Sequence, residues 1–546
     1  MKMRLLLGLA MMVGIGTAMG DVTWPKTEEE IKRWDTDKRY ASWEKDDAGT
    51  NVLKVHVPPE KRNEIGGVMG AHLLFDITPY RGKQLEISVE TKHVNLTKPM
   101  KSWLGFKMML VYKSNGRFFY PGGGNGDNTP VNTDWRRPTI VAQIPEDATA
   151  GRMELGVQDA TGTLWFKNLR FRIVEIYPDV AKLPDDFKCE YSDAVKNMPI
   201  MRGCMSPGLT NGAKAEDLHE LASWGANIIR WQVNAPKEAL RDIDKMKAVF
   251  EQHLKNLDVH IPQLRKDGLQ VIFDFHAVPG GRIKASPIAG TAGTLAGEAA
   301  NADGNSFTMF FDKKYLDAFV DLWRMVARHY KDEPIVVGYD LYNEPVQINQ
   351  VKYDYLYCQY EAAKAIREID AEKPIIIAAN NWSSAAAFNY LKPLPLKNLI
   401  YQGHMYEPGS FTHQGVGWEN MKKILDGSLK LKGYPGWFDN FYYDKNELRK
   451  ILKPIRDFQL KYNARIYMGE FSAIRFAPGA AQYIQDVIEL FEEYGWDWSY
   501  HAFREWFNWS VEYDENPHNN EPAKQDTERK KILLKYFGKN VKPKLD

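Results

Sequence analysis

Cysteine and net charge are the two things that this sequence has little of. Three cysteines occur in 546 residues, and Cys189, Cys204 and Cys358 show neither a Cys-x-x-Cys nor a Cys/His metal spacing. An odd number in a chain of this length excludes a disulfide framework, although pairing of Cys189 with Cys204 stays open. Lysine and arginine total 72 against 71 acidic residues, a net charge of +1, with no long run of one sign. The charge therefore points neither to nucleic acid nor to an anionic membrane.

Long hydrophobic runs are also missing, because no apolar run beyond the N-terminus is long enough to span a bilayer. Residues 1–20 have the pattern of a secretory signal peptide. Lys2 and Arg4 precede the uncharged run Leu5–Thr17, and Ala18-Met19-Gly20 is a small-x-small cleavage signal. An uncleaved anchor is the alternative. We expect a secreted or periplasmic protein.

Residues 21–177 have the pattern of strands separated by turns. Lys83–Val94 and Trp103–Tyr120 are rich in β-formers, and Arg136–Ile176 alternates strands with glycine-containing turns. This pattern predicts an all-β sandwich or jelly roll. The run IPEDATAGRMELGVQDATGTLWFKNLRF resembles the closing strands of jelly-roll carbohydrate-binding modules, with Lys167 where such modules usually carry aspartate. The resemblance implies a domain that holds polysaccharide, and a purely structural sandwich is the alternative.

A linker with two prolines and several charges is predicted over 178–197. From 198 to 546, short apolar runs alternate with amphipathic stretches, which is typical of a parallel α/β domain. Eight such strands predict a (β/α)₈ barrel with enlarged loops. The insertion Gly280–Phe311, rich in glycine and alanine, should border the pocket after the third strand. The predicted strands are Ile200–Cys204, Asn227–Trp231, Gln270–Phe275, Val336–Tyr342, Ile375–Ala379, Leu399–Gln402, Arg465–Met468 and Asp497–Tyr500.

Polar and aromatic side chains stand at the ends of several of these strands. In a (β/α)₈ barrel the carboxyl ends of all strands meet at one rim, where catalytic groups lie. In VVGYDLYNEPV, Pro345 ends the strand and leaves Asn343 and Glu344 at its carboxyl end. Glu470 follows the seventh apolar run in the same way. Two carboxyl groups on one pocket floor suit glycoside hydrolysis, where one donates a proton to the leaving oxygen and the other, ionised, attacks the anomeric carbon.

Other strand-end residues support this pair. Arg230 ends the second strand and is placed to keep Glu470 ionised. Asn343 is a neutral amide suited to bond a sugar 2-hydroxyl. Glu407 and Glu505 are rival carboxylates, but neither directly follows an apolar strand. Asp274 points away from its neighbours on its strand and is expected to be structural.

The motifs IIRW, DFH, LYNEP, HMY and MGEF follow one another along the chain, and they resemble those of glycoside hydrolase family 5, the retaining cellulase-like (β/α)₈ enzymes. The similarity spans roughly 198–537. It implies Glu344 as acid/base and Glu470 as nucleophile, with Tyr406 bonded to the nucleophile. The family's WxYW on the last strand reads WSYH here, so Trp506 from the following loop is assigned to sugar stacking. The substrate-binding residues implied are Arg230, His276, Asn343, His404, Tyr406 and Trp506.

The expected function is that of a secreted retaining β-glycoside hydrolase, a monomer that needs no metal or cofactor. Its expected partner is a β-linked polysaccharide, with endo-action on β-1,4-glucan or mannan; no nucleic acid and no membrane span are expected. A β-1,3-glucan or xyloglucan substrate, or a catalytically silent glycan-binding protein on the same barrel, are the alternatives. Retention predicts carboxyl groups about 5–5.5 Å apart.

Overall fold

The chain folds into two compact units, Met1–Val174 and Glu175–Asp546. The predicted signal peptide and most of the insertion 280–311 lie outside the residues that the structure, a computed structural model, describes. Among the described residues, no helix combines the length and the apolar character needed to cross a bilayer. The three cysteines are buried and free. The described residues are 22–64, 67–100, 104–114, 116–121, 129–174, 183–206, 214–284, 294–295, 306–347, 351–438 and 441–543.

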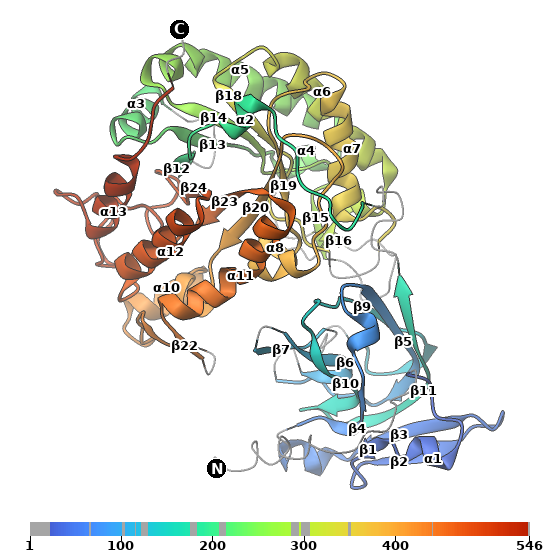
Figure 1. Cartoon of the computed structure of the whole chain (residues 1–546). Coiled ribbons are helices and arrows are strands. Elements are labelled where there is room, and N and C mark those ends of the chain that lie inside the picture. The colour runs from blue at the N-terminus through green and yellow to red at the C-terminus, as the bar shows by residue number, and fades with distance from the viewer. Residues whose placement is uncertain are drawn as a thin grey trace. The chain divides into compact units, whose positions relative to one another are not determined.

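The first unit consists of two antiparallel sheets, so the prediction of an all-β N-terminal region is confirmed (Figure 1). One sheet has the order β1 (Trp34–Thr36), β4 (Met69–Phe75), β10 (Thr149–Gln158), β6 (Gly105–Ser114) and β7 (Arg117–Phe119). The other has the order β2 (Ala41–Lys45), β3 (Asn51–Val57), β11 (Gly162–Val174), β5 (Gln84–Val94) and β8 (Thr133–Arg136), with β9 (Thr139–Gln143) also paired to β5. A short helix, α1 (Glu28–Ile31), precedes β1.

One apolar core lies between these two sheets. Alternate residues of each strand face it, as the two-residue period of a strand requires. Leu155 of β10 and Leu164 of β11 are fully buried, and the rings of Phe106 and Phe166 stack across the sheets at 5.7 Å. The sheets therefore form a sandwich around shared side chains.

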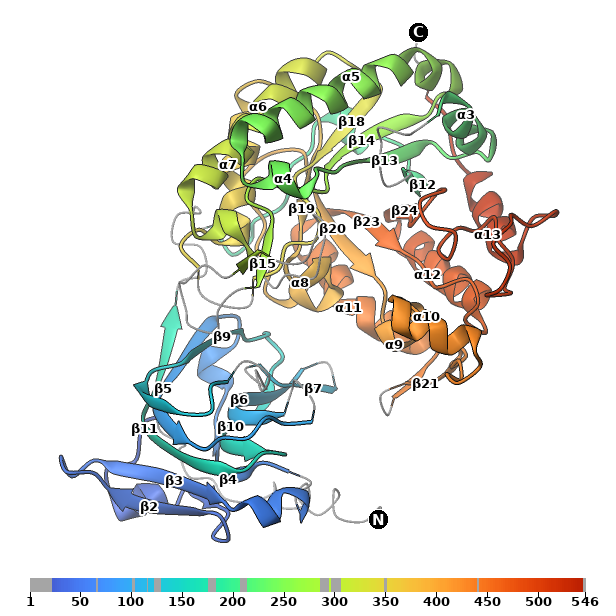
Figure 2. The same cartoon turned by 180° about the vertical axis from the view of Figure 1, so that it is seen from behind.

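The second unit contains a closed barrel of eight parallel strands, in agreement with the predicted (β/α)₈ fold (Figure 2). All eight predicted strands are present. Four of them end further along the chain than predicted, and in two of these, the sixth and the seventh, His404 and Glu470 lie within the strand rather than after it. The strands are β12 (Arg202–Met205), β13 (Ile228–Val233), β14 (Gln270–Phe275), β18 (Val336–Asp340), β19 (Ile375–Ala378), β20 (Leu399–Met405), β23 (Arg465–Phe471) and β24 (Asp497–Tyr500).

Helices surround the barrel, and several begin at an aspartate whose carboxylate accepts backbone N–H bonds. The long helices are α3 (Ala215–Ser223), α5 (Ile243–Asp267), α6 (Lys313–Tyr330), α7 (Tyr355–Arg367), α11 (Lys445–Tyr462), α12 (Ala480–Tyr494) and α13 (Glu528–Phe537). Shorter helices are α2 (Asp193–Lys196), α4 (Lys237–Leu240), α8 (Asn380–Ser383), α9 (Gly409–Thr412) and α10 (Trp418–Leu425). Loop strands are β15 (Arg282–Lys284), β16 (Thr294–Leu295), β17 (Ser306–Phe307), β21 (Gly436–Phe438) and β22 (Phe441–Tyr443).

The predicted linker reaches the barrel before its end. The Cys189 N–H donates to the Tyr462 carbonyl at 2.7 Å, and the Tyr191 hydroxyl donates to the Leu399 carbonyl at 3.0 Å. The described part of 178–197 therefore packs on the second unit from about Cys189 onward.

The side chains inside the barrel form layers, and the charged side chains occupy a layer of their own. Apolar side chains fill one layer, among them Ile228, Ile272 and Ile400. Two residues further along the same strands, Arg230 and Asp274 are buried without any exposure. Side chains two apart on a strand point to the same side, so a charged layer lies directly beyond the apolar one, toward the carboxyl ends of the strands.

Candidate active site

A cavity of about 580 Å³ opens at the carboxyl ends of the barrel strands. Six of the eight predicted site residues line it, namely His276, Asn343, Glu344, His404, Tyr406 and Glu470. The full lining is His276, Arg282, Asn343, Glu344, Asn381, Trp382, Ser384, His404, Tyr406, Glu407, Gly409, His413, Glu470, His501, Glu505 and Trp509. Arg230 lies beneath this surface, and Trp506 is not part of it.

Glu470 is buried near the end of β23 and holds hydrogen bonds on both oxygens. Arg230 donates from Nη1 to Oε1 at 2.7 Å, and the Tyr406 hydroxyl donates to Oε2 at 3.0 Å. Burial favours the protonated acid, but the electrostatic interactions with His404, His501 and Arg230 outweigh it and hold the pKa of Glu470 well below its ordinary value. The structure therefore keeps Glu470 as a carboxylate.

Arg230 connects the site to the charged layer of the barrel. Besides Glu470, its guanidinium donates to Asp340 Oδ2 at 2.8 Å, to Asp274 Oδ1 at 3.0 Å and to Asn343 Oδ1 at 3.1 Å. Burial, with the Asp274 charge added, raises the pKa of Asp340 to about 7 against the opposing effect of Arg230. A fully buried guanidinium with three carboxyl partners fixes the orientation of all of them.

Asn343 is oriented from two sides. Its Oδ1 accepts from Arg230, and its Nδ2 lies 3.2 Å from His276 Nε2. His276 is in turn held by Asp274, whose Oδ2 lies 2.8 Å from Nδ1. Asp274 thus serves as a structural anchor that fixes His276 and, through it, the amide at the cavity wall.

Glu344 follows β18 and reaches into the cavity with its side chain 21% exposed. Its backbone has φ of +48°, a left-handed conformation that an ordinary side chain rarely adopts. Arg282 stabilises this turn, because its Nη2 donates to the Glu344 carbonyl at 2.9 Å and to the Asn343 carbonyl at 3.3 Å. The sequence pattern did not single out Arg282, which lies in the long insertion.

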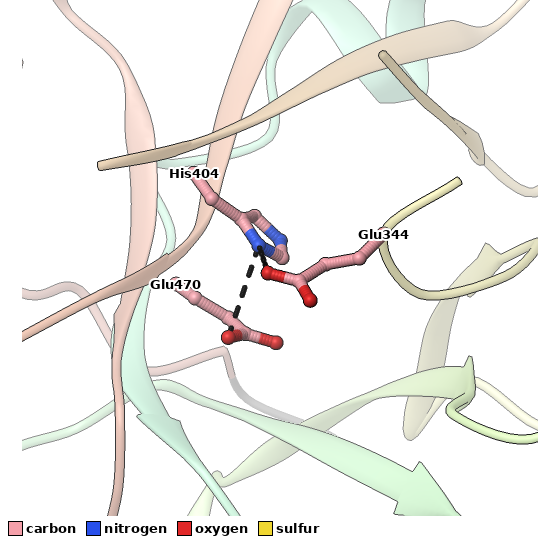
Figure 3. A group of neighbouring side chains, drawn as sticks. All are labelled: Glu344, His404 and Glu470. Carbon is pink, nitrogen blue, oxygen red and sulfur yellow. Dashed lines mark hydrogen bonds and ion pairs between the residues drawn. The ribbon is translucent and has the colours of Figure 1, made fainter. Parts of the chain in front are cut away.

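His404 stands between the two carboxyl groups (Figure 3). Its Nδ1 lies 3.0 Å from Glu344 Oε1 and 3.8 Å from Glu470 Oε2. One oxygen of each carboxyl group and a ring nitrogen of His404 all lie within 4.8 Å of one another. The three atoms could approach a cation, but both Glu470 oxygens already accept from Arg230 and Tyr406, and the adjacent guanidinium would repel a metal ion. The arrangement is better suited to a reaction in which one carboxyl group donates a proton and the other attacks a carbon atom than to metal ligation.

Trp509, rather than the predicted Trp506, supplies the tryptophan ring that lines the cavity beside His501. The N–H groups of Trp509 and Ser510 both donate to the Trp506 carbonyl, at 2.9 and 3.0 Å, in one tight turn. The turn brings the Trp509 ring parallel to His501 at 5.7 Å, whereas Trp506 packs at the edge of Trp509 at 5.8 Å. The conformation of this loop decides whether Trp506 or Trp509 lines the cavity, and the apolar pattern of the strands carries no information on the conformation of the loop.

Trp382 is a second aromatic side chain that the sequence pattern missed. It follows β19, lines the cavity and is 41% exposed. Asn381, Trp382 and Ser383 all have left-handed φ values, and the Trp382 N–H donates to the Pro345 carbonyl at 3.1 Å. The signal in the sequence was the tryptophan in NNWSS directly after an apolar strand, since asparagine tolerates left-handed conformations.

The fold and the site define a class of protein. Two carboxyl groups a few ångströms apart at the rim of a (β/α)₈ barrel, one of them held ionised, are the machinery of glycoside hydrolysis. The family model described as "Cellulase (glycosyl hydrolase family 5)" matches residues 192–511. The chain belongs to glycosyl hydrolase family 5, and it is a glycoside hydrolase.

Curated relatives carry related descriptions. Endoglucanase C of Acetivibrio thermocellus is 27% identical over 309 residues, which cover 52% of this chain and 83% of that protein. Cellodextrinase A of Ruminococcus flavefaciens is 23% identical over 291 residues, which cover 53% of this chain and 77% of that protein. A solved structure of Thermotoga maritima Cel5A with cellobiose has 22% identity and a TM-score of 0.46, covering 62% of this chain and 96% of that one.

Proposed function

We propose that this protein is a retaining endoglycosidase that cleaves β-1,4-glucan by way of a covalent glycosyl-enzyme, with Glu470 as nucleophile and Glu344 as acid/base. The observation that carries the proposal is the pair itself. One oxygen of Glu344 and one of Glu470 lie within 4.8 Å. Inverting enzymes need a separation of roughly 6.5–9.5 Å, to leave room for a water molecule between the carboxyl groups.

In the first step the Glu470 carboxylate attacks the anomeric carbon, and the bond from that carbon to the leaving oxygen breaks. Glu344 gives its proton to the leaving oxygen. Arg230 and Tyr406 hold the attacking carboxylate in one orientation, so little rearrangement is needed at the moment of attack. Asn343, fixed by Arg230 and His276, is placed to bond the sugar hydroxyl next to the anomeric carbon.

In the second step Glu344 takes a proton from a water molecule, which attacks the anomeric carbon. The ester bond to Glu470 breaks, and Glu470 leaves as a carboxylate. The hydrogen bonds from Arg230 and Tyr406 strengthen as this negative charge returns, so they favour departure of the product. Two inversions restore the configuration of the substrate.

The substrate proposal comes from relatives and from the shape of the site. The names of two curated relatives refer to endoglucanase and cellodextrinase activity, which supports a β-1,4-glucan. Trp382 and Trp509 offer flat rings on the cavity wall, and the apolar face of a pyranose packs well on such rings. Mannan, β-1,3-glucan and xyloglucan remain as competing polymers.

Reducing-sugar release by the purified protein tests the proposal on carboxymethyl cellulose, mixed-linkage glucan, mannan, xyloglucan, xylan and laminarin. We expect release from carboxymethyl cellulose and mixed-linkage glucan, with none from the Glu470→Ala variant. Size analysis of early products should show chains of many lengths, as endo-action requires. If no polymer releases reducing sugar and one of them retards the protein in a gel, the protein is a glycan-binding protein and not an enzyme.

We also propose export by the signal peptide, with cleavage before Asp21. The expected result is an exported protein whose N-terminal sequence begins DVTWP. Intact Met1 on a membrane-bound protein would point to an anchor instead.

The N-terminal sandwich is proposed to hold polysaccharide on the exposed face of its second sheet. Trp135 is 39% exposed there, and the Lys92 ammonium group lies 5.2 Å from its ring and 4.7 Å from that of Trp165. Lys167, at the position usually aspartate in such modules, pairs with Asp46 at 2.7 Å. Gel retardation of Trp135→Ala on soluble cellulose derivatives tests this surface, and unchanged retardation would favour a structural role.

A further inference from the structure

His501 stands at the end of β24, at the position where the resemblance leads one to expect tryptophan. It lines the cavity with its side chain 19% exposed, and both ring nitrogens have partners. Nδ1 lies 2.5 Å from the Tyr406 hydroxyl oxygen and 3.6 Å from Glu470 Oε2. Nε2 lies 2.9 Å from Glu505 Oε2. A chain of contacts thus runs from Glu505 through His501 and Tyr406 to Glu470.

The number of available protons decides how this chain is bonded. A tyrosine hydroxyl has one hydrogen, and an ionised carboxylate can only accept. If the Tyr406 hydrogen goes to Glu470, then His501 Nδ1 must carry the hydrogen of the contact with Tyr406. With Glu505 ionised, its contact with His501 likewise requires a hydrogen on Nε2. All three hydrogen bonds exist together only when His501 carries both protons and is an imidazolium.

The surroundings of His501 favour this charged form. Burial opposes it, but Glu505, Glu470 and Glu344 face the ring and raise the pKa of His501 to about 9. Glu505 stays ionised for the complementary reason: burial opposes its charge, and His501 lowers its pKa. Gln232 adds a donor to Glu505 Oε2 at 3.1 Å and is itself bonded to the Ser206 carbonyl at 2.9 Å. The ring also lies parallel to Trp509.

We propose that His501, held as an imidazolium by Glu505, is a positioning residue that keeps the Tyr406 hydroxyl donating to Glu470. A neutral His501 with an unprotonated Nδ1 competes with Glu470 for the Tyr406 hydrogen. Protonated only on Nδ1, it leaves Nε2 as an acceptor facing the Glu505 carboxylate. Loss of the His501 proton therefore weakens the hydrogen bond from the Tyr406 hydroxyl to Glu470, the carboxylate that attacks in the first step and departs in the second. The role of Glu470 in this argument rests on the proposed function; the protonation of His501 does not.

The test is the Glu505→Gln variant, which removes the charge next to Nε2 with little change in volume. Activity is followed on 2,4-dinitrophenyl β-cellobioside, because this leaving group needs no proton and the ionisation of Glu344 drops out of the first step. The wild type should keep kcat/KM up to about pH 9, the pH at which His501 loses its proton. The variant should lose kcat/KM about two pH units lower, with roughly tenfold less activity at pH 8 and near-equal activity at pH 5.

Asp267→Asn is the matched control. Asp267 Oδ1 pairs with His219 Nδ1 at 3.0 Å on the outer helices, and neither residue lines the cavity. This variant should reproduce the wild-type pH profile. A Glu505→Gln profile that also coincides with the wild type, or that falls by the same factor at every pH, overturns the proposal.

NMR of the histidine ring nitrogens gives a readout independent of activity. The protein has 12 histidines, and the His501 signals are assigned by their loss in His501→Gln. In the wild type, both nitrogens of the His501 ring should be protonated at pH 7.5. In the Glu505→Gln variant, the His501 ring should lose its proton at a lower pH than in the wild type. A neutral wild-type His501 at that pH overturns the inference. A wild type with this charged ring but no hydrolysis would instead overturn the proposed function alone.

Discussion

The Arg230 guanidinium lies 2.7 Å from Oε1 of Glu470, although 240 positions separate the two residues in the chain. The same guanidinium binds Asp274 and Asp340, so one cation is shared by three buried carboxyl groups. Its removal would leave those carboxyl groups without a compensating charge, and two of them, Asp274 and Asp340, have no exposure to solvent. Arg230 therefore couples the stability of the barrel to the ionisation of Glu470, the proposed nucleophile.

Arg230→Lys should fold but lose most of its activity. Lysine keeps the charge, yet a single ammonium group cannot reproduce the planar fork that bonds four partners. We expect a loss of kcat of about 100-fold or more and a destabilisation of roughly 3–5 kcal/mol, the range for a disrupted buried charge network. Thermal unfolding and steady-state kinetics measure both. Arg39→Lys, at an exposed ion pair with Asp37, is the control and should change neither.

Tyr406→Phe should reduce turnover without affecting the fold. The substitution removes the hydroxyl that donates to Glu470 Oε2 at 3.0 Å and keeps the ring. A hydrogen bond to a charged group contributes about 1.5–3 kcal/mol, so kcat should fall roughly 10- to 150-fold. Tyr442→Phe, on the exposed loop strand β22, serves as the comparison. A Tyr406→Phe enzyme with wild-type kcat would show that this donor plays no part in either chemical step.

Glu344→Ala should distinguish substrates by their leaving groups. Proton donation matters most when the leaving oxygen is basic, so cellulose and other alkyl glycosides should lose about 10²- to 10⁴-fold in formation of the glycosyl-enzyme. A dinitrophenyl glycoside should form that intermediate at close to the wild-type rate. The burst of dinitrophenol in the first turnover measures this step directly. Equal losses on both substrate types would assign Glu344 a structural role in place of the acid.

The sequence allowed prediction of the barrel and of the inner site because both depend on patterns local to each strand. Apolar runs define the strands, and Asn343, Glu344, His404 and Glu470 stand at or near their carboxyl ends, where barrel geometry brings them together. The aromatic wall was harder to predict. Trp509 faces the cavity because of a tight turn after β24, and Trp382 because of three left-handed residues after β19.

The contacts of His501 were beyond sequence patterning for the same reason. Its partners Tyr406, Glu470 and Glu505 come from three separate segments, and nothing within any one segment shows that they meet. Arg282 belongs to the insertion after the third strand, and its bonds to the backbone at Glu344 depend on the folded path of that insertion. Loop conformation set by tertiary contacts, rather than residue type, decides all these cases.

Trp382→Ala should weaken the use of polymers more than the chemistry itself. The ring lies on the cavity wall near Glu344, since the Trp382 N–H bonds the carbonyl of Pro345, the residue after Glu344. In the proposed mechanism, the leaving part of the substrate occupies the side from which Glu344 donates its proton, so we expect the ring to stack on a sugar there. Stacking on an aromatic ring contributes about 0.5–1.5 kcal/mol, which predicts a KM for cellohexaose that is about two- to twelvefold higher. With a dinitrophenyl glycoside, which places no sugar on that side, KM should stay unchanged.

Trp418→Ala is the control for loss of a surface tryptophan, because the Trp418 side chain is 79% exposed and lies outside the cavity lining. An equal rise in KM for both substrates in Trp382→Ala would place the ring against the other part of the chain, on the side of the sugar that Glu470 attacks.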